Sequence, residues 1–148
     1  MFPETEVNID NLVQQTNQAS TNTRLGRCFL FDFSEGEYVT KDGKLIEATE
    51  EQAIKQWVEL LVRTVLNKYK VYENTGFGTT FDRIIGQKTL PQGFINSEVK
   101  RELEEKVIMH KRISGISDFS TIRTRYGLEI RFTVNKVDES MQEVSMVV

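Results

Sequence analysis

Chemically reactive side chains are scarce in this sequence. It has one cysteine, Cys28, and one histidine, His110, among 148 residues. A single cysteine excludes an internal disulfide and a metal site built from several thiolates, and it fits a reducing compartment. A catalytic histidine needs an orienting carboxylate and a nucleophile, and the HKR stretch around His110 supplies neither. Structural roles are therefore expected for both residues.

An excess of positive charge and a long apolar run are also missing. The chain has 19 basic and 22 acidic residues, so it lacks the field that sequence-independent nucleic-acid binding requires. No apolar run approaches the roughly 18 residues needed to cross a bilayer. The first residues, MFPETEVNIDNLV, have neither the basic nor the apolar region of a signal peptide. We therefore expect no nucleic-acid partner, no membrane span and no export signal.

Motifs for phosphate or sugar chemistry are weak. The glycines between residues 76 and 86 match neither GxGxxG nor a P-loop, so they favour special backbone conformations. Asp32, Glu35 and Glu37 lie close together, and two carboxylates roughly 5–10 Å apart can cleave a glycosidic bond. Aromatic residues lie beside them, but no run of aromatic and amide residues that could hold a polysaccharide accompanies them. We expect no cofactor, no metal and no catalytic residue; a peptidoglycan-degrading enzyme using Glu35 or Glu37 is the alternative.

The patterning that is present begins near residue 27. Residues 1–26 are rich in Asn, Gln and Thr, and they are predicted to be either a polar arm ordered by a partner or a frayed terminus. In CFLFDF the phenylalanines share one face of an extended chain. The Asp-Gly pair at 42–43 is a hairpin signal. Residues 27–47 are therefore predicted to form short strands joined by tight turns.

A long helix is predicted next, over about residues 50–69. Thr49 and Gln52 have the spacing of a capping box. The apolar stripe of this helix comprises Ile54, Trp57, Val58, Leu61 and Val65. Beyond it, residues 69–78 (the elbow) leave the helix in an extended form, and residues 81–86 fit a short helix that ends at glycine.

A second long helix is predicted from Asn96 or Ser97 to about Lys111. Its apolar stripe comprises Val99, Leu103, Val107 and Ile108. Glu102 and Lys106 have the four-residue spacing of an ion pair on the outer surface of a helix.

The last third of the sequence alternates between apolar and polar residues, and predicts an antiparallel three-stranded meander. The segments are 116–124, 126–137 and 144–148. With the short strands, the two main helices and the one short helix, this order gives an α+β fold in a single domain over 27–148. The final EVSMVV contains no proline or lysine to blunt a sheet edge, which favours strand addition by a partner.

Arginines gather near the first turn of the predicted meander. Arg123, Arg125 and Arg131 would form a small basic patch if the two strands pair. Such a patch is either a solvated sheet face or a docking surface for an acidic partner or strand.

The succession of short motifs resembles a known family. The motifs are CFLFDFSEGEY, the tryptophan-bearing AIKQWVELLVRT, KYKVYENTGFGTTFDRIIG and VKRELEEKVIMHKRISGISDF, followed by alternating strands. Across residues 27–148 this order resembles the XkdS-like baseplate proteins of phage-like elements, relatives of the wedge and sheath-initiator proteins of contractile phage tails. The resemblance implies a structural, non-enzymatic baseplate component of a phage, prophage or tailocin. A bacterial adaptor domain unrelated to tails is a third reading.

The resemblance also implies partners. They are the tail sheath protein, the baseplate wedge proteins and the tail tube or hub proteins, in a sixfold arrangement that assembles in the bacterial cytoplasm and ends in the baseplate. Relatives template the first sheath ring by β-strand sharing. The residues expected to share strands with the sheath are Tyr126, Leu128, Arg131, Val144, Met146 and Val148.

A wedge contact is expected at the elbow. Relatives carry a Glu-Pro-Arg motif after the first long helix, whereas this chain reads NKYKVYENTGFG there and lacks the Glu-Pro pair. The local substitutes expected by position are Tyr69, Val71, Tyr72, Phe77 and Gly78.

Overall fold

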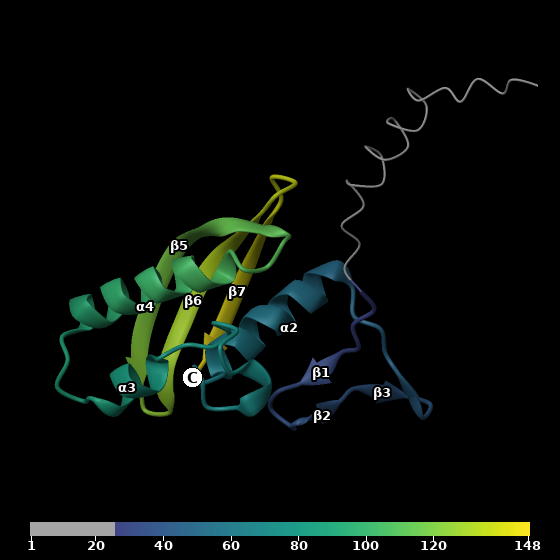
Figure 1. Cartoon of the computed structure of the whole chain (residues 1–148), viewed down its shortest axis with the longest axis horizontal. Helices are drawn as coiled ribbons and strands as arrows, with labels where there is room; N and C mark the ends of the chain where they lie inside the picture. Colours follow the sequence, from purple (N-terminus) through teal and green to yellow (C-terminus); the bar gives the residue numbers. More distant parts are fainter. Residues whose placement is uncertain (1–25) are drawn as a thin grey trace, which may run out of the picture.

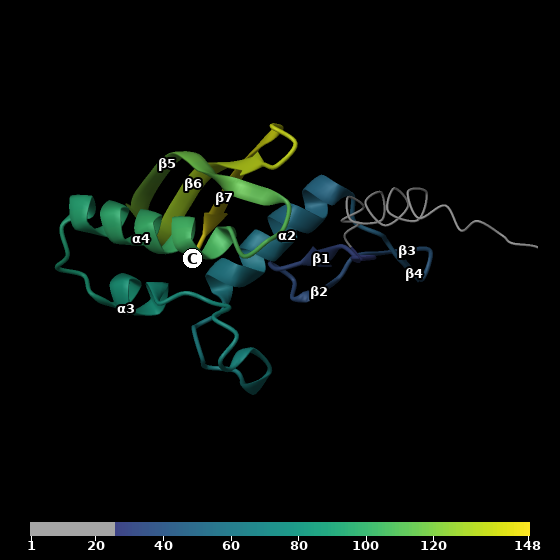
Figure 2. The same cartoon turned by 45° about the horizontal axis from the view of Figure 1, so that its top comes forward.

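The computed structural model describes residues 26–148 and has the predicted α+β architecture (Figure 1). An antiparallel sheet has the strand order β5 (Ile113–Thr124), β6 (Gly127–Lys136), β7 (Met141–Val147). Helices α2 (Glu50–Arg63) and α4 (Gln92–Val107) lie against one face of this sheet, which arches over α4 in Figure 2. The predicted polar arm comprises residues 1–26, of which residues 1–25 lie outside the described part of the chain.

The start of α2 follows from its capping residues. The Thr49 hydroxyl accepts a hydrogen bond from the Gln52 N–H at 3.3 Å, and the Gln52 side chain accepts one from the Thr49 N–H at 2.9 Å. This reciprocal pair satisfies two N–H groups that the first helical turn leaves without a partner. The predicted capping box is confirmed.

The end of α2 differs from the prediction, because the helix stops at Arg63 instead of continuing to about Tyr69. Thr64 has an extended backbone, and its carbonyl accepts a hydrogen bond from the Thr79 N–H at 2.8 Å. Val65 then pairs with Thr79 in a parallel bridge. Pairing with a segment distant in the sequence therefore ends a helix that the apolar spacing alone would extend.

Helix α4 also differs from the prediction at both ends. It starts at Gln92, directly after Pro91, whose fixed φ suits a helix start and whose carbonyl accepts from the Ile95 N–H at 3.1 Å. It ends at Val107, where the chain turns toward β5. The turn leaves Ile108 57% exposed, so this residue does not belong to the buried stripe.

The hydrophobic core lies between the sheet and the helices. Its helical members are Ile54, Val58, Leu61, Val62, Phe81, Ile95, Val99, Leu103 and Val107. Its sheet members are Ile113, Leu128, Ile130, Phe132, Val134, Val144 and Met146, and Phe77 of the elbow completes it. Each fully buried side chain of this kind contributes roughly 1.5–3 kcal/mol relative to exposure, so this layer carries most of the stability.

The N-terminal strands form two small hairpins beside α2, away from the sheet (Figure 1). Strand β1 (Phe31–Asp32) pairs with β2 (Glu37–Tyr38), and β3 (Thr40–Lys41) pairs with β4 (Lys44–Leu45). At the β3–β4 turn Asp42 and Gly43 have φ values of 51° and 73°, as a two-residue hairpin turn requires. The predicted short strands and tight turns are confirmed.

Candidate functional site

Strand β7 is an edge of the sheet, and its alternate residues bond to β6. The Val148 N–H donates to the Leu128 carbonyl at 3.0 Å, and the Leu128 N–H donates to the Val148 carbonyl at 2.7 Å. Bonded pairs alternate along an antiparallel ladder, and the β6–β7 register is continuous. Val144 and Met146 therefore also direct their backbone groups to β6, while their side chains enter the core.

The intervening residues of β7 direct their backbone groups away from the sheet. Glu143, Ser145 and Val147 stand opposite β6 residues in the non-bonded pairs of the ladder. Their side chains are exposed on the outer face of the sheet. Across residues 26–148, no hydrogen bond reaches the outward backbone groups of these three residues. The β7 edge is thus a row of free donors and acceptors of the kind that recruits another strand.

The opposite edge of the sheet is less suited to pairing, because a bulge interrupts it and α4 bonds to part of it. The pairing of β5 with β6 is interrupted between Ser117 and Ser120 by a bulge, where Asp118 has a φ of 51°. Beyond the bulge, the outward carbonyl of Thr121 accepts a hydrogen bond from the Gln92 side chain of α4 at 3.0 Å. Bulges and covering helices are two of the means by which proteins prevent edge pairing. Of the two edges, β7 is therefore the one suited to strand addition.

The predicted strand-sharing residues fall into different environments. Tyr126 lies in the β5–β6 turn and is 86% exposed. Arg131 lies on the outer face of the sheet, where its guanidinium pairs with the Glu129 carboxylate at 2.6 Å. The others are the buried Leu128, Val144 and Met146 and the partly buried Val148. Their role in partner binding stays a prediction, and the structure identifies the outward residues of β7 as the available backbone groups.

The elbow divides into an exposed part and a buried part. Tyr69 and Val71 are 49% and 75% exposed, around a single 3₁₀ turn at Lys70–Tyr72. The Tyr72 ring packs on the Phe77 ring at 4.7 Å between centroids, and Phe77 is buried. Gly78 is also buried. Among the residues predicted to contact a wedge protein, Tyr69 and Val71 are therefore the ones whose side chains a partner can reach.

Gly78 is required by the path of the chain. Its φ is +113°, which side-chain-bearing residues rarely adopt, and a Cβ there would lie 2.9 Å from the Thr64 carbonyl oxygen. The backbone of Gly78 therefore packs directly against the backbone at the end of α2, and there is no room for a side chain between them.

Two charged side chains of α4 hold the elbow and Thr80 just beyond it, and sequence reasoning misplaced both. Glu102 is 7% exposed, and its carboxylate accepts from the Thr80 N–H at 2.7 Å and from the Thr80 hydroxyl at 2.8 Å. The Lys106 ammonium donates to the Gly76 carbonyl at 2.7 Å. The predicted outer ion pair between Glu102 and Lys106 is wrong. One signal was available: Glu102 follows the buried Val99 by three residues, which places both on one helical face.

The carboxylates near β1 are used in a turn. Asp32 Oδ1 accepts hydrogen bonds from the N–H groups of Ser34 and Glu35 at 2.8 and 3.2 Å, and these bonds lower the pKa of Asp32. A general acid needs the opposite shift. Glu35 and Glu37 are exposed. Nothing in this geometry favours sugar cleavage.

His110 has a structural environment. The ring is partly buried, packs edge-on against Trp57 with centroids 4.8 Å apart, and accepts from the Arg112 N–H through Nδ1 at 3.2 Å. Burial lowers its pKa, and the charge of Arg112 lowers it further. Residues 26–148 contain no cluster of three His, Cys, Asp or Glu residues able to hold a metal ion. In the same residues, no helix has the length and apolar character needed to cross a bilayer.

Comparison with known proteins gives one family. The family model of the contractile injection system sheath initiator matches residues 27–139, which is most of the chain. The matched part includes the N-terminal hairpins, the helices, β5 and β6, and it stops just before β7. No curated protein matches the chain. The family match confirms the resemblance that the short motifs indicated.

Proposed function

The chain belongs to the contractile injection system sheath initiator family, and on that basis we propose that β7 is where it starts the sheath. Members of this family are structural components of contractile injection systems, so the sheath and the baseplate are the expected surroundings. In the proposal, a strand from a subunit of the first sheath ring adds to the β7 edge. The observation that carries the proposal is the contrast between the continuous, free β7 edge and the β5 edge, which a bulge interrupts and α4 partly covers.

The register of such an addition follows from the ladder. An incoming strand would bond to the backbone of Glu143, Ser145 and Val147, because these residues direct their N–H and carbonyl groups outward. Main-chain bonds supply affinity in strand addition, and alternate side chains supply specificity. Each new bond contributes a net stabilisation of roughly 0.5–1.5 kcal/mol. Val144 and Met146 would support the edge from inside the core without touching the incoming strand.

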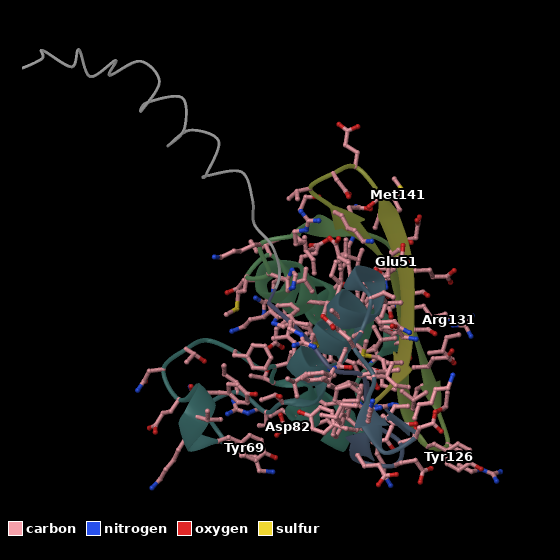
Figure 3. The ribbon with its side chains drawn as sticks, turned by 90° about the vertical axis from the view of Figure 1, so that its right-hand side faces the viewer. Glu51, Tyr69, Asp82, Tyr126, Arg131 and Met141 are labelled. Carbon is pink, nitrogen blue, oxygen red and sulfur yellow. The ribbon has the colours of Figure 1, made fainter. Side chains whose placement is uncertain are left out.

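A second contact, with a wedge protein of the baseplate, is proposed at the elbow. Tyr69 and Val71 supply exposed apolar surface there. Lys106 holds the elbow at Gly76, and Glu102 holds Thr80 just beyond it. In Figure 3, Tyr69 lies on the helical side of the molecule, and Met141, the first residue of β7, lies on the sheet side. The two proposed contacts are therefore well separated, so a wedge protein and a sheath strand can be bound together. Such bridging suits a ring of copies around the tail tube.

The edge proposal is tested by replacing Ser145 with proline. Proline removes the outward N–H of Ser145, which β6 does not use, and edge strands tolerate proline where the lost N–H faces outward. Ser145→Ala is the matched control, because it removes the hydroxyl and keeps the N–H. We expect Ser145→Pro particles to show naked tubes or unassembled sheath by negative-stain microscopy, whereas Ser145→Ala particles carry normal sheaths.

The proline variant must be folded for this result to count. Its thermal unfolding and its recovery in purified baseplates are measured first, and Val147→Pro serves as a second variant if Ser145→Pro is unstable. Normal sheaths on particles that contain a folded proline variant would show that sheath initiation does not use this edge.

The wedge contact has its own test. Tyr69→Ser combined with Val71→Asp makes the exposed part of the elbow polar, and we expect the variant chain to be lost from purified baseplates. Leu45→Ser, which alters an exposed apolar residue of β4, is the control and is expected to be retained. Retention of the elbow variant at the level of wild type would contradict the elbow contact and leave the β7 proposal untouched.

A further inference from the structure

A groove beside the short helix α3 (Phe81–Gly86) has an apolar floor. Its volume is about 350 Å³, and it lies between α3 and the turn that joins β5 to β6. The floor consists of Ile84, Ile85, Ile95 and Leu128. Ile95 and Leu128 belong to the core, and the other two pack partly buried against it. The floor therefore extends the core to the surface and can accept one or two apolar side chains.

The rim of this groove is positively charged. Lys88, Arg123 and Arg125 line it, and no carboxylate from the part of the chain that the structure describes does. The Arg123 guanidinium donates to the carbonyls of Gln87 and Lys88, each at 3.0 Å, and these bonds hold it in place at the rim. Among residues 26–148, none of the three cations forms an ion pair with a carboxylate. In a chain of net charge −3, this local excess of positive charge favours an acidic occupant.

The arginine patch expected from the sequence is therefore divided in two. Arg131 points to the outer face of the sheet and is neutralised by Glu129. Arg123 and Arg125 instead join Lys88, which comes from the segment after α3. The chemistry that fits the groove is an apolar side chain in a segment that also carries carboxylates.

The sequence contains one segment with this chemistry outside the described residues. Residues 4–13 read ETEVNIDNLV, with three acidic residues among four aliphatic ones, and the first basic residue of the chain is Arg24. We propose that residues 4–13 of a second copy of this chain dock in the groove. The aliphatic side chains would cover the apolar floor, and the carboxylates would face the three cations of the rim.

The position of the groove favours a second copy as the donor. The described chain begins beside the β1–β4 hairpins, on the far side of α2 from α3 (Figure 1). A donor and an acceptor on opposite sides of one molecule make a head-to-tail contact, which closes into a ring when the rotation between neighbours allows it. This contact is independent of strand addition at β7, so either proposal can fail without the other.

The test is charge reversal followed by mixing, with full-length chains. The groove variant is Lys88→Glu with Arg125→Glu, the segment variant is Glu4→Lys with Glu6→Lys and Asp10→Lys, and self-association is measured by sedimentation velocity. The wild type is expected to self-associate at low salt and to dissociate at high salt. Each variant alone is expected to associate at least about tenfold more weakly. An equimolar mixture of the two is expected to regain association, because each then meets a segment or groove of opposite charge.

A control variant and a peptide probe separate docking in the groove from a general effect of charge. Lys44→Glu with Lys111→Glu reverses two exposed lysines elsewhere and should leave association unchanged. A fluorescent peptide of residues 1–23 should bind the segment variant and should not bind the groove variant. The proposal is overturned by a wild type that stays monomeric, by variants that associate as the wild type does, or by a mixture that does not recover. Peptide binding without self-association would show that the segment docks on its own chain, which also overturns the second-copy assignment.

Discussion

The part of the molecule from α2 onward and the N-terminal hairpins at residues 27–47 are both rich in apolar residues, yet they are held differently. The first part contains every member of the buried core. In the hairpins no residue is buried. The hairpins are held on α2 through Gln56, which accepts from the Phe31 N–H at 2.8 Å and donates to the Phe29 carbonyl at 3.0 Å. Apolar content therefore does not by itself produce a core.

The aromatic rings of the hairpins show why. Phe31 packs edge-on against Phe33 and Tyr38, with centroids 5.1 and 5.2 Å apart. The rings thus contact one another at the surface, and two-residue strands provide no second layer to cover them. An isolated two-stranded hairpin is at best marginally stable in water. The two regions therefore differ in how deeply their apolar side chains are buried, although both are rich in apolar residues.

The largest effect should come from removing one phenylalanine from each region. Phe132→Ala empties a fully buried site in β6 and should lower the free energy of unfolding by roughly 3–5 kcal/mol. Phe31→Ala removes a half-buried ring and should cost less than about 1.5 kcal/mol. Both values come from urea unfolding followed by circular dichroism. Equal losses would show that the hairpins share the core's stability.

A smaller effect is expected at the contact between α4 and Thr80, just beyond the elbow. Glu102→Ala leaves the Thr80 N–H and hydroxyl without their acceptor and should cost roughly 1–3 kcal/mol. Glu105→Ala, an exposed glutamate of the same helix, should change stability by less than about 0.5 kcal/mol. Urea unfolding of the two variants gives the comparison. A Glu102→Ala variant as stable as Glu105→Ala would mean that the carboxylate does not hold the chain at Thr80.

The hairpins should detach more easily than the core unfolds. Gln56→Ala removes both hydrogen bonds to residues 29 and 31, each worth roughly 0.5–1.5 kcal/mol. Hydrogen exchange should accelerate across 29–47, while exchange in β6 stays as in the wild type. Lys55→Ala, at the exposed neighbouring position, is the control. Faster exchange in β6 as well would mean that the two regions unfold as one unit.

The smallest effect is a dependence of stability on pH, in the part of the molecule from α2 onward. Burial depresses the pKa of His110 below its ordinary value of about 6.5, so protonation favours the unfolded chain. The stabilising contribution is complete above about pH 6.5 and is lost as the pH falls through the depressed pKa. His110→Gln should flatten this part of the stability profile measured by thermal unfolding. An unchanged slope in the variant would assign the pH dependence to other groups.

Much of the fold could be predicted because local signals and packing agree. The capping box fixes the start of α2, and the alternation in β6 fixes which face of the sheet is buried. The errors occur where a distant segment decides the outcome. Val65 fits the helical stripe, but its bridge to Thr79 ends the helix first. No sequence pattern near Val65 indicates that it will pair with Thr79, on the other side of the elbow.

The candidate site was less predictable for a related reason. The C-terminal strand was correctly placed in the sheet, but the apolar residues that make it conspicuous, Val144 and Met146, belong to the core. The backbone groups that are free to bond with a partner belong to the intervening residues, Glu143, Ser145 and Val147. Likewise, Glu102 resembles a surface residue by type, and its burial depends on Thr80, which lies far away in the sequence. Sequence patterns locate such elements more readily than they locate the polar contacts between them.

The alternation along β7 has a consequence for how this strand can vary. The side chains of Val144 and Met146 are buried in the core, whereas those of Glu143, Ser145 and Val147 are exposed. Substitutions at the second set can therefore accumulate at little cost to folding, provided that they keep an extended backbone. The strand thus contains two sets of residues under different constraints. The buried set is constrained by the fold, and the exposed set can change together with the sequence of a chain that binds beside it.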